Sequence, residues 1–269
     1  ATQITDDESR QKLLNELAVY APKEMLVNVD RTECPELLNF AKDRLGAFFD
    51  DTQPELFDTE SFDKVVKQFG EEVFEKNLLY KGSPVTVALG ALLEYLRQTQ
   101  KMDLEYIDKL EYYTNELFLG IDVNTRRSLE LCETMRSKEK KGTLLWVLDK
   151  TKTAMGARLL RKWVEQPLMS VKSIVKRQQA VAELYDSYIE KEEMQNLLSF
   201  VNDLERLMTK IVYNTAGGKD LRALYQTISV LGPLKALLES MKSKELCELC
   251  ESLDTLDDIG GYIDKAIVE

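Results

Sequence analysis

Hydrophobic residues recur at helical spacing along most of this chain, most regularly in its C-terminal half. Leu221, Leu224, Ile228 and Leu231, for example, follow one another at i, i+3, i+7 and i+10, which places them on one face of a helix. The pattern predicts successive helices over residues 143–148, 154–165, 171–186, 190–200, 203–213, 219–238 (interrupted at Gly232-Pro233), 244–253 and 256–268, with Ser170, Asn202 and Thr255 as N-caps.

The first 82 residues combine helical and extended patterns. A helix is predicted from Asp6 until Pro22 ends it, and residues 24–29 alternate like a short half-buried strand. One helix and one strand cannot form a sheet alone, so we expect the neighbours of this strand to lie outside the chain. Further helices are predicted over 35–45 and, capped by Thr59 and ended by Gly70, over 60–69, with connections at 50–58 and 71–82.

Ser83-Pro84 marks the start of the next helix, because serine caps well and proline suits the first turn. The residues that follow are apolar on nearly all sides, so this helix is expected to be buried in the middle of a bundle. Residues 110–121 are predicted to form a hairpin around Thr114-Asn115, and Asp122 to cap a helix up to Cys132. The chain is therefore predicted to be mainly α, with a helical bundle core at 83–269 preceded by a partial α/β segment at 1–82.

The composition, 44% hydrophobic and 31% charged, is that of a folded globular protein and argues against disorder. No run approaches the roughly 18 apolar residues of a membrane span, and the polar N-terminus has no signal-peptide core. Four scattered cysteines do not suggest a disulfide framework. We therefore expect a cytoplasmic protein with no membrane contact. Because residue 1 is alanine, we also expect a piece of a longer chain.

Charge is distributed unevenly. The chain has 36 basic and 47 acidic residues, but the stretch from Arg136 to Arg177 has 12 basic residues against three acidic ones and is therefore +9. The remaining 24 basic and 44 acidic residues give −20, and such a body repels the DNA backbone. Helical spacing spreads the basic residues around the surface, so a solvated or partner-facing role is favoured over direct DNA contact.

Residues with obvious chemistry are scarce. Without histidine, a histidine-based triad or metal site is excluded. Gly217-Gly218-Lys219 lacks the hydroxyl and the first glycine of a phosphate-binding loop, because Asp220 and Tyr213 stand at those positions. Cys247 and Cys250 lack the second ligand pair that zinc needs, so two half-buried thiols are favoured. No catalytic, cofactor-binding or metal-binding residue is predicted.

One segment, residues 144–168, carries a distinctive pattern, which falls on Thr153, Gly156, Arg158, Leu160, Trp163, Pro167 and Leu168. It resembles the core domain of the MutS family of DNA mismatch-recognition ATPases, in which a short helix leads into T-x-x-G-x-R-x-L-x-x-W-x-x-x-P-[LV]. We expect the glycine to let a neighbouring helix approach and the tryptophan to fill a large void. The arginine is expected to pair with a carboxylate or to cap carbonyl groups rather than to meet phosphate.

Further segments resemble the same family in the same order. Residues 6–29 are similar to the end of its connector domain, and 93–100 to the helix that opens its core. The D-x-x-T-R-x-[NS]-L-E-[IL] pattern occurs at 121–131, with Ser128 where asparagine is usual, a small change at the start of a helix. R-x-x-A-V-x-x-[LF] occurs at 177–184, D-L-E-R at 203–206 and [RK]-D-L at 219–221.

The resemblance implies a parent protein that binds mismatched double-stranded DNA as a homodimer. It also implies that the parent uses ATP and Mg²⁺ as a DNA-dependent ATPase, works with a MutL-type repair protein, and acts in the bacterial cytoplasm at the nucleoid. By the same analogy, this chain covers the end of the connector domain (1–82) and the core or lever domain up to the clamp insertion (83–269). It would then couple DNA and nucleotide sites carried by other domains, with no bound cofactor and no turnover of its own.

Two other classes of function are weighed against this one. An acidic helical scaffold or adaptor with no nucleic-acid role would suit the acidic body and the missing chemistry. A small enzyme with a carboxylate or cysteine nucleophile would need a perturbed carboxyl pair or thiol in a cleft, and no spacing in the sequence suggests one.

Overall fold

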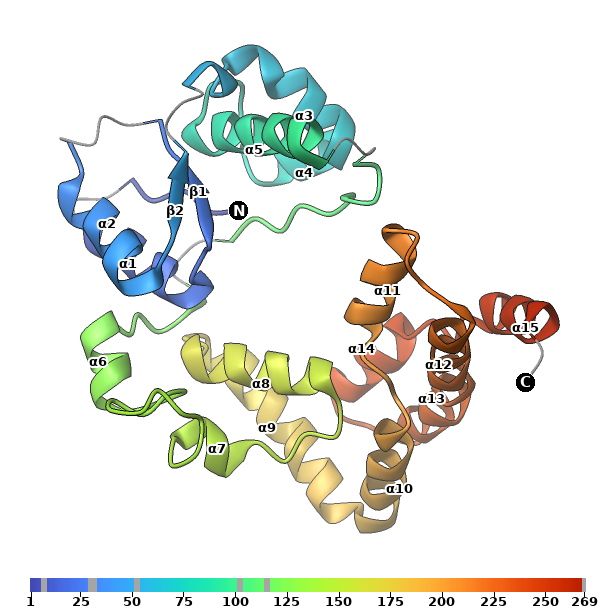
Figure 1. Ribbon diagram of the computed structural model, residues 1–269. Helices are drawn as coiled ribbons and strands as arrows, with labels where there is room; N and C mark the ends of the chain where they lie inside the picture. The colour runs from blue at the N-terminus through green and yellow to red at the C-terminus, as the bar shows by residue number, and fades with distance from the viewer. Residues whose placement is uncertain (6–8, 29–32, 51–53, 101–103, 114–116, 268–269) are drawn as a thin grey trace. The chain divides into compact units, whose positions relative to one another are not determined.

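The computed structural model of this chain describes residues 1–5, 9–28, 33–50, 54–100, 104–113 and 117–267. It is mainly α and divides into two compact units, Ala1–Arg126 and Arg127–Glu269 (Figure 1). Each unit has its own apolar clusters. No helix in the described ranges combines the length and the apolar character needed to cross a bilayer.

The first unit begins with a small α/β element. Helix α1 (Ser9–Tyr20) precedes strand β1 (Glu24–Leu26); α2 (Pro35–Phe40) continues as the π-helical turn η1 (Ala41–Leu45) and leads to β2 (Phe48–Asp50). The two strands pair in parallel, with Glu24 opposite Phe48. The expectation that β1 has no neighbour in the chain was therefore wrong, because β2 is only three residues long and gives almost no alternating pattern.

The rest of the first unit is helical. The 3-10 turns η2 (Pro54–Leu56) and η3 (Thr59–Ser61) precede α3 (Phe62–Phe69), α4 (Glu71–Lys76) and α5 (Pro84–Gln100). Asp58, rather than Thr59, caps η3 by accepting a hydrogen bond from the Glu60 N–H. The connection predicted at 71–82 contains α4, whose Phe74 packs in the core with Val65 and Leu93.

Helix α5 is buried on one side only. A Cβ added to Gly90 would lie 1.9 Å from Ser61 Oγ, so glycine is needed for α5 to pack this closely against η3. Leu92, on another side of α5, is 47% exposed. The prediction that α5 is buried all round was therefore wrong: part of its apolar surface faces away from the core.

The hairpin predicted at 110–121 is not supported by the part of the chain that is described. Its turn, Thr114-Asn115, lies outside the described residues. The described flanks, 110–113 and 117–121, belong to neither β1 nor β2. Tyr113 instead donates its N–H to the Ala1 carbonyl at 3.0 Å and its hydroxyl to Glu16 Oε2 at 2.6 Å. These contacts attach the segment to the beginning of the chain.

The second unit consists of helices that are joined mostly by short turns, with a longer connection at 129–143 between α6 and α7, and α6 spans its boundary with the first. The bounds of α8 and α9 match the predicted 154–165 and 171–186. The predicted interruption of 219–238 is confirmed, but the two helices meet at Val230, two residues before the predicted Gly232-Pro233. The elements are α6 (Val123–Ser128), α7 (Leu144–Leu148), α8 (Ala154–Glu165), α9 (Val171–Asp186), α10 (Tyr188–Ser199), α11 (Leu204–Val212), α12 (Gly218–Ser229), α13 (Leu231–Glu239), α14 (Lys244–Ser252) and α15 (Asp257–Ala266).

The N-caps of the second unit follow the sequence only in part. Ser170 caps α9 as predicted, by accepting a 3.4 Å hydrogen bond from the Ser173 N–H. Asn202 does not cap α11, because the next residue, Asp203, takes that position. Thr255 does not cap α15 either: the N-cap position is Leu256, and the threonine hydroxyl donates to Asp257.

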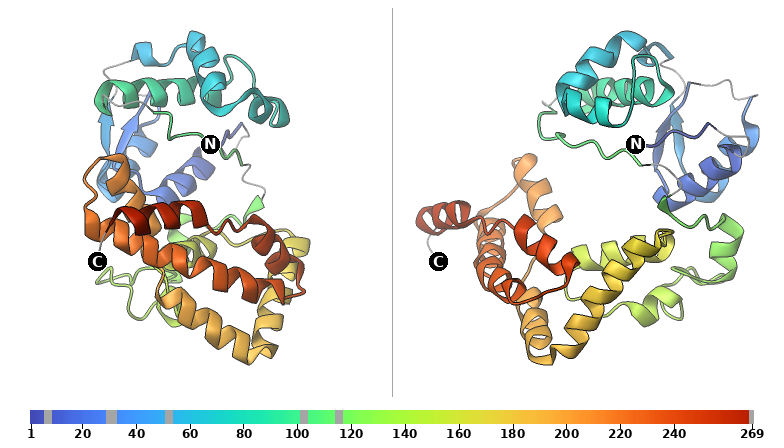
Figure 2. Two further views of the ribbon diagram at one scale, coloured as in Figure 1. Left: turned by 90° about the vertical axis from the view of Figure 1, so that its right-hand side faces the viewer. Right: turned by 180° about the vertical axis from the view of Figure 1, so that it is seen from behind.

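The contact-based boundary after Arg126 differs from the domain boundary expected at residue 82. Helix α5 packs against α3 and η3, and its Val85 and Leu93 belong to the apolar cluster of the first unit. Beyond the boundary, one apolar cluster joins α9, α13 and α14 around Ala180, and another joins α11, α12 and α15 around Ile228. The ribbons of these helices are coloured from yellow (α9) to red (α15) in Figure 2.

Two adjacent glycines of α15 provide a test of its packing on α12. A Cβ at Gly260 would lie 2.9 Å from Ile228 Cγ2, whereas a Cβ at Gly261 would meet nothing within 4 Å. Because the β-branched Ile228 has little rotamer freedom, we expect Gly260→Ala to destabilise the chain by about 1–3 kcal/mol in urea unfolding. Gly261→Ala, the matched control, should stabilise it by about 0.5–1 kcal/mol. Equal effects of the two substitutions would contradict this packing.

Candidate functional site: an ion-pair junction in the second unit

Helix α8 carries the 153–168 motif, and each end of the helix is set by a motif residue or its neighbour. The Thr153 hydroxyl caps the helix by accepting a 2.9 Å hydrogen bond from the Gly156 N–H. At the other end, the Gln166 N–H donates to the Lys162 carbonyl, and Pro167 follows directly. A proline cannot continue the hydrogen-bond pattern of a helix, so the chain turns here.

Gly156 has a different role from the one predicted. A Cβ at this position would lie 2.9 Å from Thr153 Oγ1 and 3.5 Å from Thr151 Cβ, and no atom of a neighbouring helix is among its nearest contacts. The glycine therefore leaves room for the capping threonine rather than for a second helix.

Trp163 also departs from its prediction. Its side chain is 39% exposed, and the Arg177 guanidinium carbon lies 3.7 Å from the ring centroid. Trp163 thus connects α8 to α9 through a cation–π contact, which contributes about 0.5–1 kcal/mol at an exposed position. The prediction that it fills a core void was wrong. The contact nevertheless joins two motif segments, since Arg177 begins the pattern at 177–184.

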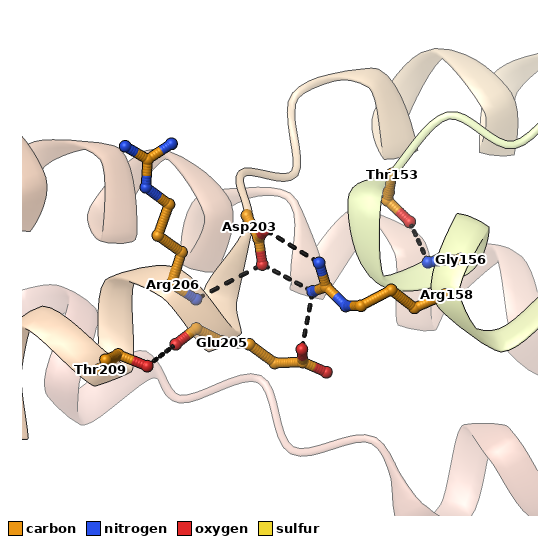
Figure 3. Close-up of polar contacts among 7 residues, drawn as sticks. All are labelled: Thr153, Gly156, Arg158, Asp203, Glu205, Arg206 and Thr209. Carbon is orange, nitrogen blue, oxygen red and sulfur yellow. Dashed lines mark hydrogen bonds and ion pairs between the residues drawn. The ribbon is translucent and has the colours of Figure 1, made fainter. Parts of the chain in front are cut away.

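Arg158 makes the contact that joins α8 to α11. Its guanidinium donates to Asp203 Oδ2 at 3.1 Å and Oδ1 at 2.7 Å, and its Nη2 lies 2.8 Å from Glu205 Oε2 (Figure 3). The planar fork of arginine suits such two-point pairing, which lysine cannot reproduce. The prediction that Arg158 pairs with a carboxylate is confirmed, and its partners are the first and third residues of the D-L-E-R segment.

Asp203 serves two elements at once. Besides pairing with Arg158, its Oδ1 accepts a 3.4 Å hydrogen bond from the Arg206 N–H and so caps α11. The Arg206 guanidinium points away from the carboxylates (Figure 3). The hydrogen bond from Arg158 lowers the pKa of Asp203, and the same bond raises the pKa of Arg158. The charged pair is thus favoured at neutral pH.

From α11 the polar contacts continue to α12. Lys210 forms an ion pair with Asp220, which lowers the pKa of that carboxyl group, and Asp220 Oδ2 accepts a 3.1 Å hydrogen bond from the Gly217 N–H. The Gly217-Gly218-Lys219 loop is therefore closed by a carboxylate of its own helix. Asn202, just before α11, donates its amide to the Ala223 carbonyl at 3.0 Å.

The last connections reach α15 and α14. Arg222 of α12 pairs with Asp264 of α15 at 3.0 Å. From α9, Lys176 pairs with Glu245 and Glu248 of α14, and Glu183 accepts 2.6 Å and 2.7 Å hydrogen bonds from the Lys242 and Ser243 N–H groups that precede that helix. Ion pairs and capping bonds therefore link α8 to α11, α12 and α15, and separately link α9 to α14.

The described contacts of the junction are ion pairs and helix caps. Cys250 is buried and Cys247 half-buried, and both are free thiols. Within the described ranges, no group of three or more histidine, cysteine, aspartate or glutamate residues is arranged to hold a metal ion. The partners of Arg158 could not be predicted, because nothing in a linear pattern indicates that position 158 meets position 203.

Comparison with known proteins gives a consistent result along the whole chain. Residues 1–108 match the family model of MutS domain II, and residues 124–269 match that of MutS domain III. The DNA mismatch repair protein MutS of Acetivibrio thermocellus is 40% identical over 272 residues, which cover 100% of this chain and 31% of the relative. MutS of Lachnoclostridium phytofermentans is 39% identical, covering 99% of the chain and 29% of the relative. The chain thus spans under a third of either relative.

The two roles of Asp203 can be separated by substitution. Asp203→Asn keeps a capping oxygen but removes the charge that faces Arg158, whereas Asp203→Ala removes both. We expect the thermal unfolding midpoint to fall from wild type to Asp203→Asn and further to Asp203→Ala. In an Arg158→Gln background, Asp203→Asn should have a smaller effect than alone. If Asp203→Asn lowers the unfolding midpoint as much in the Arg158→Gln background as in wild type, the ion pair contributes nothing to stability.

The lowered carboxyl pKa values predict loss of stability in acid. The hydrogen bond from Lys140, with further bonds from Thr151, lowers the pKa of Asp149 from 3.8 to about 2, and those of Asp203 and Asp220 are lowered as well. Because a lowered folded-state pKa means that the unfolded chain binds protons more readily, these groups stabilise the fold above about pH 4, the unfolded value. Their contribution is lost as the pH falls towards 2.

This acid dependence can be measured by urea unfolding between pH 7 and pH 2. Lys140→Met should reduce the loss between pH 4 and pH 2, because Asp149 would then titrate closer to its ordinary value. An unchanged acid profile in Lys140→Met would contradict the assignment of the Asp149 shift to Lys140.

Proposed function

Because this chain belongs to the MutS family of DNA mismatch repair proteins, we propose that it forms the connecting core of a mismatch-recognition ATPase. In this role it would transmit conformational change between a DNA-binding region and a nucleotide-binding region carried elsewhere in the protein. The observation that supports the proposal best is the Arg158–Asp203–Glu205 junction, in which one side chain holds two helices whose motifs lie 45 residues apart.

The geometry suits transmission in two respects. Coupling between distant sites requires elements that move as units and contacts that can be exchanged between two arrangements. Helices α8, α11, α12 and α15 are joined through side-chain ion pairs at their ends and faces. Because these pairs are solvent-accessible, each contributes little to stability and can break and re-form at modest cost.

The partners of the whole protein follow from the same proposal. It would bind mismatched double-stranded DNA, use ATP with Mg²⁺, form a homodimer and engage a MutL-type repair protein in the bacterial cytoplasm at the nucleoid. The basic excess between Arg136 and Arg177 does not require DNA contact for this role, because Arg158, Arg161 and Lys176 are paired with carboxylates. No observation favours the scaffold alternative.

The proposal can be tested in a longer MutS protein that contains this chain. Three quantities are measured: mismatch affinity without nucleotide, ATP turnover without DNA, and the rate of ATP-triggered release from a mismatch. We expect Arg158→Gln to slow the release about fivefold or more, while the first two quantities change less than twofold, because the substitution weakens coupling and not either site.

Arg161→Gln is the matched control. Arg161 lies one turn from Arg158 on the same helix, but its carboxylate partners are Glu165 of α8 itself and Glu133, so it does not join α8 to α11. Release should remain within twofold of wild type in this variant. Normal release in Arg158→Gln, or equal slowing in both variants, would overturn the coupling role of the junction.

A further inference from the structure

The short helix α7 exposes an unusual amount of apolar surface. Of its five residues, Leu145 alone is buried. The other four, which we call the α7 face, are between 45% and 58% exposed: Leu144, Trp146, Val147 and Leu148. A cluster of large apolar side chains that remains open to water is a common feature of protein-binding surfaces.

A structured basic loop adjoins the α7 face. Residues 133–142, the basic loop, lie between Leu131 and the helix. The Leu144 and Leu145 N–H groups donate to the Glu130 and Leu131 carbonyls just before the loop, and the Thr143 N–H donates to the Lys140 carbonyl within it. Within the loop, Thr134 accepts from Glu139 at its hydroxyl and donates to the Glu139 carbonyl from its N–H. Met135, at 49% exposed, adds a further apolar side chain.

The backbone of this region is held in conformations that cost free energy. Glu130 and Lys138 are non-glycine residues in the left-handed region, at φ 47° and 54°. Such residues persist only where surrounding contacts fix them, and they concentrate at binding and switch regions. Here the Lys138 N–H donates to the Thr134 carbonyl, and the Met135 N–H donates to Glu130 Oε1. The loop therefore presents its side chains from a defined scaffold.

The charge around the α7 face is strongly positive. Residues 136–152 contain six basic residues (Arg136, Lys138, Lys140, Lys141, Lys150 and Lys152) and two acidic ones, Glu139 and Asp149, which gives a net charge of +4. Lys140 is paired with Asp149. In the part of the chain that is described, no ion pair involves Arg136, Lys138 or Lys141. These three cations are available to a partner.

We propose that the α7 face and the basic loop form a docking surface for an acidic amphipathic segment of a protein. Apolar residues of that segment would cover Trp146 and Val147, and its carboxylates would pair with Arg136, Lys138 and Lys141. A DNA backbone satisfies only the second requirement, because phosphates gain nothing from contact with aliphatic side chains. Electrostatic complementarity at the rim and apolar burial at the centre are the general arrangement of protein interfaces. The proposal does not depend on the coupling role of the junction.

The two tryptophans of the chain, Trp146 and Trp163, make this surface directly observable. In a Trp163→Phe background, Trp146 is the sole indole, and its fluorescence reports contact at the α7 face. The probe is an 18-residue amphipathic peptide of leucine and glutamate. We expect it to cause a saturable blue shift of Trp146 emission, because its apolar side would exclude water from the indole. A leucine and lysine peptide of the same pattern should cause none.

Substitutions test whether the peptide binds at the α7 face and the basic loop. Val147→Glu should weaken peptide binding on the order of tenfold, because a carboxylate would face the acidic segment and its apolar centre. The paired change Lys138→Glu and Lys141→Glu should weaken it similarly. Tyr262→Glu, on α15 and 77% exposed, is the control and should leave affinity unchanged. Circular dichroism checks that each variant is folded.

Four results would overturn the proposal. The first is no shift with the leucine–glutamate peptide, and the second is an equal shift with the leucine–lysine peptide. The third is a shift caused by an 18-base-pair DNA duplex when neither peptide causes one, which would make the surface a nucleic-acid contact. The fourth is a shift that grows with protein concentration in the absence of peptide and vanishes in Val147→Glu, which would make its occupant a second copy of the chain.

Discussion

The arrangement of the second unit depends on one shared carboxylate. Asp203 starts α11 by accepting the Arg206 N–H and at the same time holds Arg158 of α8 in a two-point ion pair. The same two carboxylate oxygens therefore cap helix α11 and attach helix α8 to it. Such pairing fixes the orientation of α8 relative to α11 more than it stabilises the fold. The guanidinium fork sets the angle at which the two helices meet, while solvent screens its charge.

Two further carboxylates also connect helices and accept backbone N–H groups where a helix begins. Asp220 pairs with Lys210 while accepting the N–H that precedes α12, and Glu183 of α9 accepts the two N–H groups that precede α14. In each case a helix begins at a carboxylate that also touches another helix. The apolar clusters around Ala180 and Ile228 supply the burial, and the carboxylates determine where each helix starts relative to its neighbours.

The sequence predicted the helices of the second unit well and their contacts poorly. The bounds of α8 and α9 could be predicted because Thr153 and Ser170 are strong caps and apolar residues recur regularly behind them. Strand β2 could not, since three residues carry no periodicity and their pairing depends on β1, more than 20 residues earlier. Trp163 was assigned to the core by its size, yet a cation from the next helix stabilises it at the surface. The chemistry of Arg158 indicated a carboxylate or carbonyl partner, but the sequence did not indicate that this partner would be Asp203.

The carboxylate of Glu183 has a consequence for how the chain folds. The N–H groups that it accepts, on Lys242 and Ser243, follow it by about 60 residues, so the start of α14 has no local cap and cannot be completed until a loop of that length has closed. Closing such a loop costs entropy that only the later apolar contacts repay. Helix α9, which carries its own cap, can form early, whereas α14 acquires a defined first turn only on docking. The first turn of α14 is therefore completed only when Glu183 of α9 reaches it.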